Sequence, residues 1–257
     1  MKHGDFTELA KFYVNRPGYS LAVLELIRDH IMKAQGKDKI LVADVGAGTG
    51  KLTENLEQLG LTGYAVEPND AMRAEGIKLF ENHNTFRWLE GSAEVTNLPD
   101  NSVDWILMGS SFHWADAPRA MKEFHRVLKN GGFFTAIWNP RNIESSDLHK
   151  RIEDAVYTEI PKMKRVSSGK TISTEEMEEK LLSGGYFKNI LFVEAPHVEI
   201  MTKERYMNTW KSVNDIQVQA GEEGFHRILN KLEEIIQEFD EIEVPYLSRS
   251  WTVQSCK

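Results

Sequence analysis

Short apolar runs alternate with helical patterns through the first half of the chain, and this alternation restricts the fold more than any other feature. The runs suited to buried strands cover residues 40–45, 63–68, 85–91, 103–109 and 133–139. The stretches between them carry apolar residues at helical spacing. Strands that are joined through helices pair in parallel, with right-handed crossovers. We therefore expect an α/β fold with a doubly wound, mostly parallel sheet.

Capping residues mark the ends of two of the helices. Ser20 precedes one helix and Gly36 follows it. Asp116 precedes the helix that leads to the fifth strand, and Gly131 is expected after its end. The second half is predicted to hold helices over 145–160, 173–187, 202–213 and 224–239, and strands over 188–200 and 241–254. We expect the helix over 224–239 to cover the sheet.

Composition limits the partners and the compartment of the chain. The 257 residues suit one large domain, and the formal net charge of -8 disfavours binding to nucleic acid. The single cysteine, Cys256, permits no internal disulfide and no cluster of cysteine ligands, so we predict no metal. We find neither a membrane span nor a signal peptide. A cytoplasmic protein is expected, without membrane binding, and its oligomeric state stays unknown.

A glycine-rich loop, "VGAGTGKLT", directly follows the first predicted strand. Loops of this kind bind a nucleoside triphosphate, a dinucleotide or S-adenosylmethionine. A triphosphate loop has the pattern G-x-x-x-x-G-K-[ST]. Here Gly46 lies one residue too close to Gly50, and Leu52 stands where the magnesium-binding hydroxyl belongs. The triphosphate interpretation is therefore disfavoured.

A dinucleotide loop has the pattern G-x-G-x-x-G, and this chain departs from it as well. Counted from Gly46, the third glycine falls on Lys51, whose side chain prevents the same close approach of the helix. Asp44, just before the glycines, would face a pyrophosphate unfavourably. An acid and alternating glycines suit a cationic ligand that carries no phosphate. Glu67, which ends the next strand, can accept hydrogen bonds from two ribose hydroxyls, a feature that dinucleotide sites share.

Asp44 followed by G-x-G-x-G resembles the first motif of class I S-adenosylmethionine-dependent methyltransferases. Residues 91–139 resemble the same family from its adenine loop to its fifth strand. "FYVNRPGYS" and "SSFHWAD" resemble the small-molecule sub-group that includes trans-aconitate methyltransferases. The resemblance implies a seven-stranded, Rossmann-like sheet with helical N-terminal and C-terminal insertions that form a cap. It also implies one domain over 1–257, a lid over 1–35, and an acceptor pocket formed by insertions over 140–180 and 200–240.

The resemblance further implies the cofactor, S-adenosyl-L-methionine, with S-adenosyl-L-homocysteine as its product. The residues expected to bind the cofactor are Asp44, Gly46, Ala47, Gly48, Gly50, Glu67, Pro68, Ser92, Ala93, Glu94, Gly109, Ser110 and Arg16. Many members of the family have an aspartate at the position of Ser92. The serine here leaves the strength of the adenine contact open.

Methyl transfer is a displacement at a sulfonium carbon, in which the enzyme aligns the acceptor and excludes water. A base is needed only when the acceptor arrives protonated. His113 and Tyr13 are the catalytic candidates, although a structural role for each is equally open. The candidates for contact with the substrate are Tyr19, Phe112, Trp114, Asn139 and Trp210, and beyond these Trp138, Arg141 and Tyr206.

The predicted function is methyl transfer to a small-molecule acceptor, at an O, N, S or C centre. Analogy with the trans-aconitate sub-group points to a carboxylate. Two alternatives remain: an enzyme that cyclises or eliminates on the cofactor itself, and a non-catalytic cofactor-binding protein. An oxidoreductase is a further, minor alternative.

Overall fold

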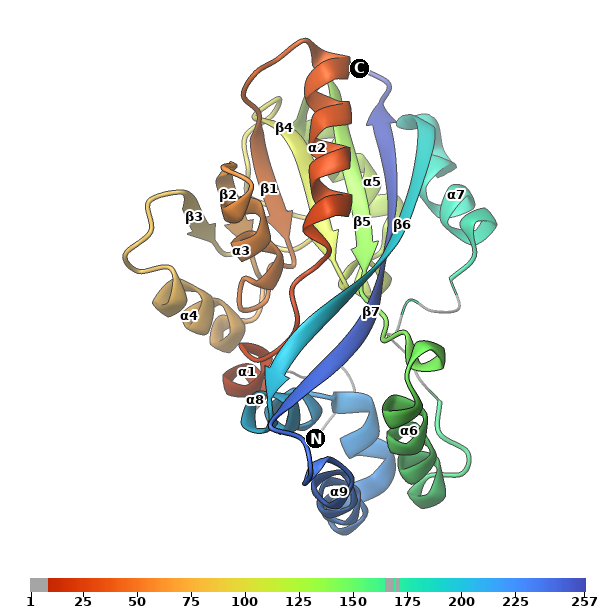
Figure 1. Cartoon of the computed structure of the whole chain (residues 1–257). Helices are drawn as coiled ribbons and strands as arrows, with labels where there is room; N and C mark the ends of the chain where they lie inside the picture. The colour runs from red at the N-terminus through yellow and green to blue at the C-terminus, as the bar shows by residue number, and fades with distance from the viewer. Residues whose placement is uncertain (1–8, 165–168, 170–171) are drawn as a thin grey trace.

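A seven-stranded sheet forms the centre of the molecule in the computed structural model, which describes residues 9–164, 169 and 172–257 (Figure 1). The strand order is β3-β2-β1-β4-β5-β7-β6. The strands are β1 (Leu41–Val45), β2 (Thr62–Val66), β3 (Phe86–Leu89), β4 (Val103–Gly109), β5 (Leu128–Trp138), β6 (Phe187–Thr202) and β7 (Glu241–Ser255). Strands β1 to β5 pair in parallel, whereas β7 runs antiparallel to both β5 and β6. The expected doubly wound, mostly parallel sheet is confirmed.

Helices cover both faces of the sheet because its central strands are apolar on both sides. On one face, α2 (Leu21–Gln35) and α3 (Lys51–Gln58) pack in a buried cluster that includes Val42 of β1. On the other face, α5 (Ala117–Val127) and α7 (Thr174–Leu182) pack in a cluster that includes the next residue, Ala43. The remaining sheet helix, α4 (Asp70–Leu79), lies beside β3 (Figure 1).

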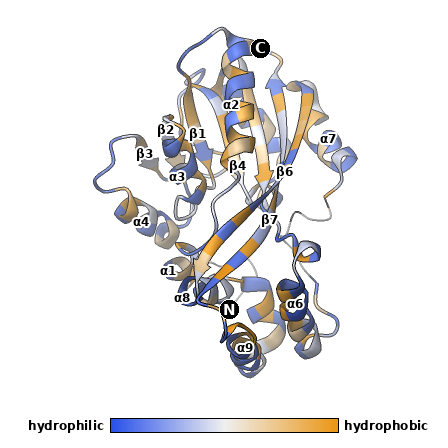
Figure 2. Ribbon diagram, viewed as in Figure 1, coloured by the Kyte–Doolittle hydropathy of each residue, from blue (hydrophilic) through white to orange (hydrophobic). Residues whose placement is uncertain are grey.

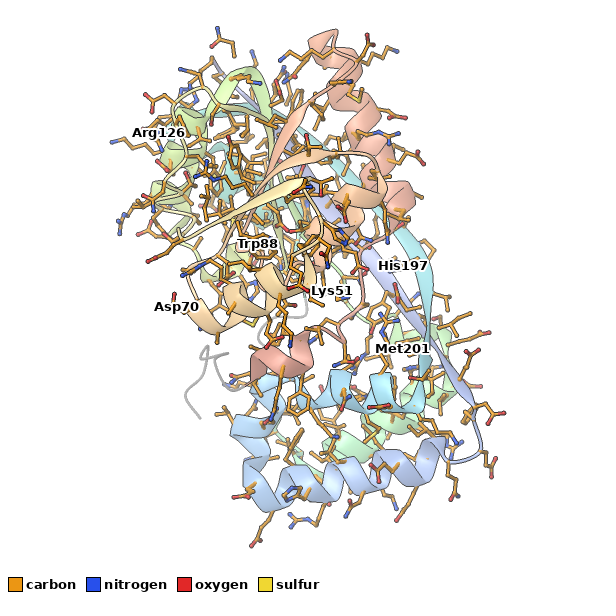
Figure 3. The ribbon with its side chains drawn as sticks, turned by 90° about the vertical axis from the view of Figure 1, so that its left-hand side faces the viewer. Lys51, Asp70, Trp88, Arg126, His197 and Met201 are labelled. Carbon is orange, nitrogen blue, oxygen red and sulfur yellow. The ribbon has the colours of Figure 1, made fainter. Side chains whose placement is uncertain are left out.

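A helical cap lies beyond the carboxyl ends of the parallel strands (Figure 1). It consists of α1 (Ala10–Tyr13), α6 (Asp147–Glu159), α8 (Lys203–Lys211) and α9 (Asn214–Ile236). The lower halves of β6 and β7, residues 195–202 and 241–248, leave the sheet as a two-stranded ribbon that reaches this cap. Figure 2 shows apolar residues along the ribbon, and Figure 3 labels Met201 near its end. Met201 and Ile242 join the apolar side chains of α6, α8 and α9 in a core of their own.

The boundaries of most elements agree with the prediction, with two corrections. Helix α9 begins at Asn214, ten residues earlier than expected, and continues through a kink at Gly221. It packs in the cap core and does not cover the sheet, so that prediction was wrong. Gly131 does not follow the end of α5, because the helix stops at Val127 and β5 already begins at Leu128. Within the described residues, no helix is both long enough and apolar enough to cross a membrane.

Candidate active site

A cavity of about 810 Å³ opens where the carboxyl ends of the parallel strands meet the cap. This volume is in the upper part of the range for small-molecule sites, roughly 300–1,000 Å³. The sheet side of its wall includes the segments after β1, β2 and β4, as is general for doubly wound sheets. The predicted residues that line it are Tyr13, Arg16, Tyr19, Asp44, Gly46, Ala47, Gly48, Glu67, Pro68, Ser92, Ala93, Glu94, Gly109, Ser110, Trp114, Asn139 and Arg141.

The glycine loop after β1 follows a backbone path that other residues adopt with strain. Gly46 has a φ of +70°, and an added Cβ there would lie 2.8 Å from the hydroxyl oxygen of Ser111. Gly50, with a φ of +94°, precedes the first residue of α3, and an added Cβ would lie 2.6 Å from the Phe80 ring. The backbone N–H groups of Gly46 and Ala47 both donate to the carbonyl of Val66. The loop is thus fixed to β2 and leaves its inner side open to the cavity.

Asp44 lies at this loop as a fully buried carboxylate. Its Oδ2 accepts a hydrogen bond of 2.6 Å from the Thr53 hydroxyl. Its Oδ1 has no hydrogen-bond partner among the described residues. Burial raises the pKa of Asp44 to about 7, and the nearby charge of Glu67 adds to this rise, although the Thr53 bond opposes it. A positively charged ligand group beside Asp44 would favour the ionised form.

Glu67, directly after β2, is held in place by two backbone donors. Its Oε2 accepts from the N–H of Gly48, and its Oε1 accepts from the N–H of Asn69, each at 2.8 Å. Burial raises the pKa of Glu67, whereas these two bonds oppose the rise. Each carboxylate oxygen has two lone pairs, so both oxygens can still accept a hydrogen bond from a ligand hydroxyl.

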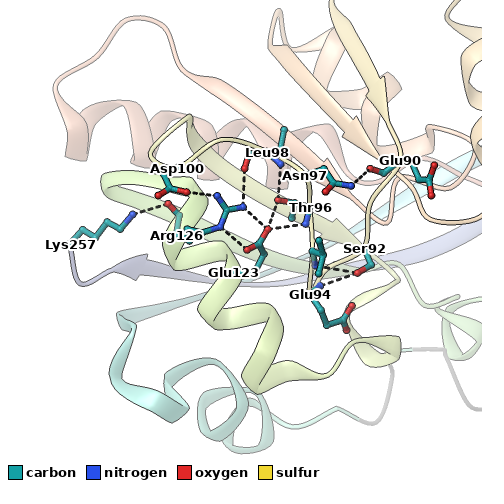
Figure 4. Close-up of polar contacts among 11 residues, drawn as sticks. Glu90, Ser92, Glu94, Thr96, Asn97, Leu98, Asp100, Glu123, Arg126 and Lys257 are labelled. Carbon is teal, nitrogen blue, oxygen red and sulfur yellow. Dashed lines mark hydrogen bonds and ion pairs between the residues drawn. The ribbon is translucent and has the colours of Figure 1, made fainter.

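The segment that is predicted to contact adenine is held in place by two side chains of α5, Glu123 and Arg126, which together are called the brace (Figure 4). Glu123 accepts hydrogen bonds from both the N–H and the hydroxyl of Thr96, at 2.8 and 2.7 Å. Arg126 donates to both oxygens of Glu123 and to the carbonyl of Leu98. These contacts, led by Arg126, outweigh the effect of burial and lower the pKa of Glu123 to about 2. The brace therefore keeps its charges throughout the neutral pH range.

Ser92 is part of a turn within this segment. Its Oγ accepts from the N–H groups of Glu94 and Val95, each at 3.3 Å. The Glu94 carboxylate in turn accepts from the N–H of Asp116, at the start of α5. Ser92 thus shapes the loop through its own backbone bonds, and it offers no carboxylate to a ligand.

Residues 12–20, here called the strap, run from the end of α1 to the start of α2 and border the cavity. Arg16 donates to the carbonyl of Ser212, and its guanidinium lies 5.0 Å from the centroid of the Tyr13 ring. The Tyr19 hydroxyl donates to the Ser110 hydroxyl at 3.0 Å. The Asn139 amide donates to the carbonyl of Gly18 at 2.7 Å. The strap is therefore held by the cap at one end and by the sheet at the other.

Four predicted site residues do not line the cavity: Gly50, which turns the chain into α3, and the rings of His113, Phe112 and Trp210. His113 lies against the rings of Trp114 and Trp138, and its Nδ1 accepts a weak bond of 3.4 Å from the Trp138 indole. Burial lowers the pKa of His113 to about 4, and Lys180 adds to this effect. Phe112 is 3% exposed and packs on Phe134 in the core under α5. These positions correct the predictions of a catalytic His113 and a wall-forming Phe112.

Trp210 is a further correction, because it is fully buried in the core of the cap. Tyr206 is buried beside it, and Trp138, the last residue of β5, is buried in the core that includes α7, so neither lines the cavity. Packing in the cap core thus keeps the aromatic rings of Tyr206 and Trp210 away from the cavity. Trp210 affects the cavity only indirectly, through Arg141, whose guanidinium carbon lies 4.0 Å from the centre of its ring.

The cap half of the cavity contains residues that the sequence did not indicate. These are Ile143, Glu144, Glu153, Tyr157, Val213, Asn214, Asp215 and Tyr246. Asp215 is 8% exposed at the start of α9, and its Oδ1 accepts from the N–H of Ile216. Polar residues are common at the start of a helix. The sequence around Asn214 and Asp215 therefore does not distinguish them from ordinary helix-capping residues. Tyr246 lies on the β6–β7 ribbon, and the sequence does not show that this ribbon leaves the sheet toward the cap.

The wall from Asp44 to Glu94 fits S-adenosylmethionine by its chemistry. The unpaired Oδ1 of Asp44 suits a cationic group, and Glu67 retains lone pairs for two ribose hydroxyls. The glycine loop leaves room for backbone contact with a ligand, and Lys51, which follows the loop, is paired with Glu54 at 2.9 Å. The Arg16 guanidinium lines the same cavity and suits a carboxylate.

Comparisons with known proteins agree with this geometry. Residues 43–136 match the model of a methyltransferase domain family. An uncharacterised methyltransferase of Mycobacterium tuberculosis is 42% identical over 105 residues, which cover 39% of this chain and 40% of the relative. The match therefore spans about two fifths of the length of that relative. An uncharacterised methyltransferase of Schizosaccharomyces pombe is 28% identical over 240 residues, covering 90% of this chain and 86% of the relative.

Among solved structures, a proposed type II methyltransferase from Anaeromyxobacter dehalogenans superposes with a TM-score of 0.61. The two chains are 18% identical, and the alignment covers 93% of this chain and 97% of the other. At this identity the likeness concerns the fold. Over residues 43–136 the chain is therefore similar to a methyltransferase domain family, and over most of its length it shares the fold of a solved methyltransferase.

Proposed function

We propose that this protein transfers the methyl group of S-adenosylmethionine to a small-molecule acceptor, by in-line displacement at the sulfonium carbon. One observation carries the proposal. The wall that fits the cofactor, from Asp44 to Glu94, and the polar residues of the cap line the same cavity. Its volume of about 810 Å³ leaves space for a second small molecule beside a cofactor. The resemblance of "SSFHWAD" and "FYVNRPGYS" to the small-molecule sub-group favours the same acceptor class.

In this proposal the sheet side of the cavity binds the cofactor. Asp44 faces its ammonium group, Glu67 accepts from the ribose hydroxyls, and Arg16 pairs with its carboxylate. The loop from Ser92 to Glu94 lies against the adenine, held by the brace from Glu123. The exposed ring of Trp114 lines the cavity, and an aromatic face attracts a sulfonium charge.

The chemistry we propose needs no strong base from the protein. His113 is outside the cavity wall, and burial raises the pKa of Tyr13, which therefore stays protonated near neutral pH. An acceptor that already carries a lone pair at neutral pH, such as a carboxylate or thiolate, requires only alignment and exclusion of water. Tyr13 then acts through its position at the cavity rather than as a base.

We further propose that the described part of the predicted lid, residues 9–35, closes over the bound cofactor. The insertions over 140–180 and 200–240, apart from residues 165–168 and 170–171, which lie outside the described residues, form the acceptor pocket. Residues 1–8 of the predicted lid also lie outside the described part of the chain. A cytoplasmic location agrees with the single cysteine.

Calorimetric titration with S-adenosylmethionine and S-adenosylhomocysteine tests the cofactor half of the proposal. Both ligands should bind, and Glu67→Gln should weaken binding by roughly tenfold or more, since it removes a charged acceptor. Glu178→Gln, an equal charge change on the exposed surface of α7, serves as the control and should leave the affinity unchanged. A folded protein that binds neither ligand would contradict the proposal.

Incubation with methyl-labelled S-adenosylmethionine tests the reaction. The label should move to a compound in a small-molecule extract, with S-adenosylhomocysteine as the second product. Conversion of the cofactor in the absence of any extract would instead support cyclisation or elimination on the cofactor itself.

A further inference from the structure

Arg141 is the cation at the cap side of the cavity, and it is held from two sides. Its guanidinium carbon lies 4.0 Å from the centre of the Trp210 ring, so the flat side chain is supported by an aromatic face. Its backbone also pairs with Tyr246 across an isolated β-bridge. Trp210 is fully buried and Tyr246 is 3% exposed, so both supports are rigid parts of the cap.

Arg141 is half-buried and lacks an acidic partner, and among the half-buried arginines of the described residues it shares this only with Arg16. A carboxylate lies within 4.0 Å of each of six arginines: Arg28, Arg73, Arg126, Arg205, Arg227 and Arg249. Arg141 forms no ion pair with any residue in the described part of the chain, even though Glu153 lies near enough to affect its charge. Arg87, Arg119 and Arg151 form no ion pair either, but they are exposed and do not line the cavity, whereas Arg16 and Arg141 do.

The half-buried guanidinium of Arg141 forms no ion pair within the described residues and is therefore poorly satisfied. It has five N–H donors in one plane and stays charged at all physiological pH values. Stacking on Trp210 occupies a face of the group and leaves the in-plane donors available. Each nitrogen of the Arg141 guanidinium is either exposed to solvent or hydrogen-bonded. Because Arg141 lines the cavity, its exposed N–H donors are available to a ligand there. Such an arrangement matches the planar, two-oxygen geometry of a carboxylate.

We propose that Arg141 is a specificity-determining residue that binds a carboxylate of the acceptor. This inference rests on the proposed function, and it adds a class of substrate to it. The carboxylate acts as an anchor, and the methyl group goes to another atom of the acceptor. Methylation of the anchoring carboxylate would remove the negative charge that Arg141 binds, and pairing with a guanidinium makes that carboxylate a weaker nucleophile.

The neighbouring acids limit how many negative charges the acceptor carries. Glu144, Glu153 and Asp215 line the same half of the cavity. Carboxylates at these positions repel a ligand with several negative charges, whereas a single anchoring carboxylate can pair with Arg141. The acceptor class is therefore a small monocarboxylate, and tricarboxylates are disfavoured.

Calorimetry on the protein saturated with S-adenosylhomocysteine tests this inference. The probes are butyrate and phenylacetate as monocarboxylates, phenylacetamide as a neutral analogue, and tricarballylate as a tricarboxylate. At least one monocarboxylate should bind, with an affinity that falls roughly tenfold or more in Arg141→Met. Phenylacetamide and tricarballylate should bind more weakly than that monocarboxylate. Arg141→Lys keeps the charge but loses the planar fork, and should give an intermediate affinity.

Arg227→Met removes the same charge from an exposed site on α9 and serves as the matched control. Melting temperatures of all variants identify any that misfold, in which case Arg141→Lys alone decides the result. The inference is overturned if no monocarboxylate binds the wild type more tightly than the Arg141 variants, or if the neutral amide or tricarballylate binds as well as the acids. Loss of S-adenosylhomocysteine binding in the wild type would instead contradict the proposed function.

Discussion

Asp44 illustrates how burial prepares a side chain for a charged ligand. Its carboxylate is fully buried, and a pKa of about 7 leaves it partly protonated at neutral pH in the free protein. Because the folded protein holds this proton more tightly than the unfolded chain does, the associated stability is fully present at low pH and is lost as the pH rises through about 7. Binding of a cation has the opposite dependence, since it requires the ionised carboxylate.

We therefore expect the affinity for S-adenosylhomocysteine to rise by up to about tenfold between pH 6 and pH 8, following the ionisation of a single group. Asp44→Asn should bind more weakly at pH 8 and should lose most of this slope. Titration calorimetry at several pH values measures both effects. An unchanged slope in Asp44→Asn would show that another group, on the protein or the ligand, causes the pH dependence.

His113 provides a prediction of the opposite kind. The ring does not line the cavity, and its pKa of about 4 keeps it neutral at physiological pH. His113→Phe should therefore keep the rate of methyl transfer within a few fold of the wild type, and any loss should appear as a lower melting temperature. A loss of about a hundredfold in rate with no change in stability would restore the catalytic role.

At the residue scale, the sequence indicated many of the residues that line the sheet side of the cavity and few of those on the cap side. Asp44 and Glu67 follow strands directly, so their positions are determined by local pattern. His113, Phe112 and Trp210 were chosen by residue type, and type alone cannot show which way a ring points. Asp215 and Tyr246 enter the cavity through long-range packing, which a single sequence does not reveal.

In the proposed function the strap closes over the cofactor, and its contacts with the sheet and the cap hold it in place. On the sheet side, Asn139 donates to the carbonyl of Gly18 and accepts from the Ser248 hydroxyl at 3.0 Å. The same Ser248 oxygen accepts from the N–H of Ser20 at 2.9 Å. Asn139 thus connects the strap to β7 through both ends of its amide, although it was predicted to contact substrate.

We expect Asn139→Leu to weaken S-adenosylhomocysteine binding by about five- to tenfold, the effect of losing one or two hydrogen bonds. Ser248→Ala removes a different member of the same network and should have a similar, smaller effect. Calorimetry measures the affinities, and hydrogen exchange at residues 18–20 should increase in both variants. If the affinity falls while exchange in the strap does not change, Asn139 contacts the ligand directly.

Helices and strands were the most predictable elements, and the exceptions have a shared cause. The caps at Ser20, Gly36 and Asp116 are short-range signals, and the structure has them where the pattern indicates. The wrong position of α9 came from the assumption that an apolar helix face must cover the sheet. The β6–β7 ribbon provides a second apolar surface beyond the sheet, and it is this surface that α9 covers.

At the scale of the whole molecule, the cap and the sheet have separate apolar cores connected by the ribbon and the strap. The strap meets the cap through the carbonyl of Asn15, which accepts hydrogen bonds from Thr209 and Arg205 of α8. Arg16 then donates to the carbonyl of Ser212, at the end of the same helix. The position of α8 is therefore coupled to the closure of the cofactor site, since both ends of the strap must be held at once.

This coupling predicts that a change in the cap affects a ligand bound against the sheet. Thr209→Val keeps the shape of a buried side chain but removes the hydroxyl that lies 3.1 Å from the carbonyl oxygen of Asn15 and 2.9 Å from that of Arg205. We expect S-adenosylhomocysteine affinity to fall about fivefold, because a hydrogen bond contributes roughly 1 kcal/mol, with only a small decrease in melting temperature. Thr158→Val, which removes an exposed hydroxyl from α6 in the same cap, is the matched control and should leave the affinity unchanged. Equal affinities for Thr209→Val and the wild type would mean that the sheet-side contacts of Asn139 are sufficient to hold the strap, and that the cap contributes to acceptor binding alone.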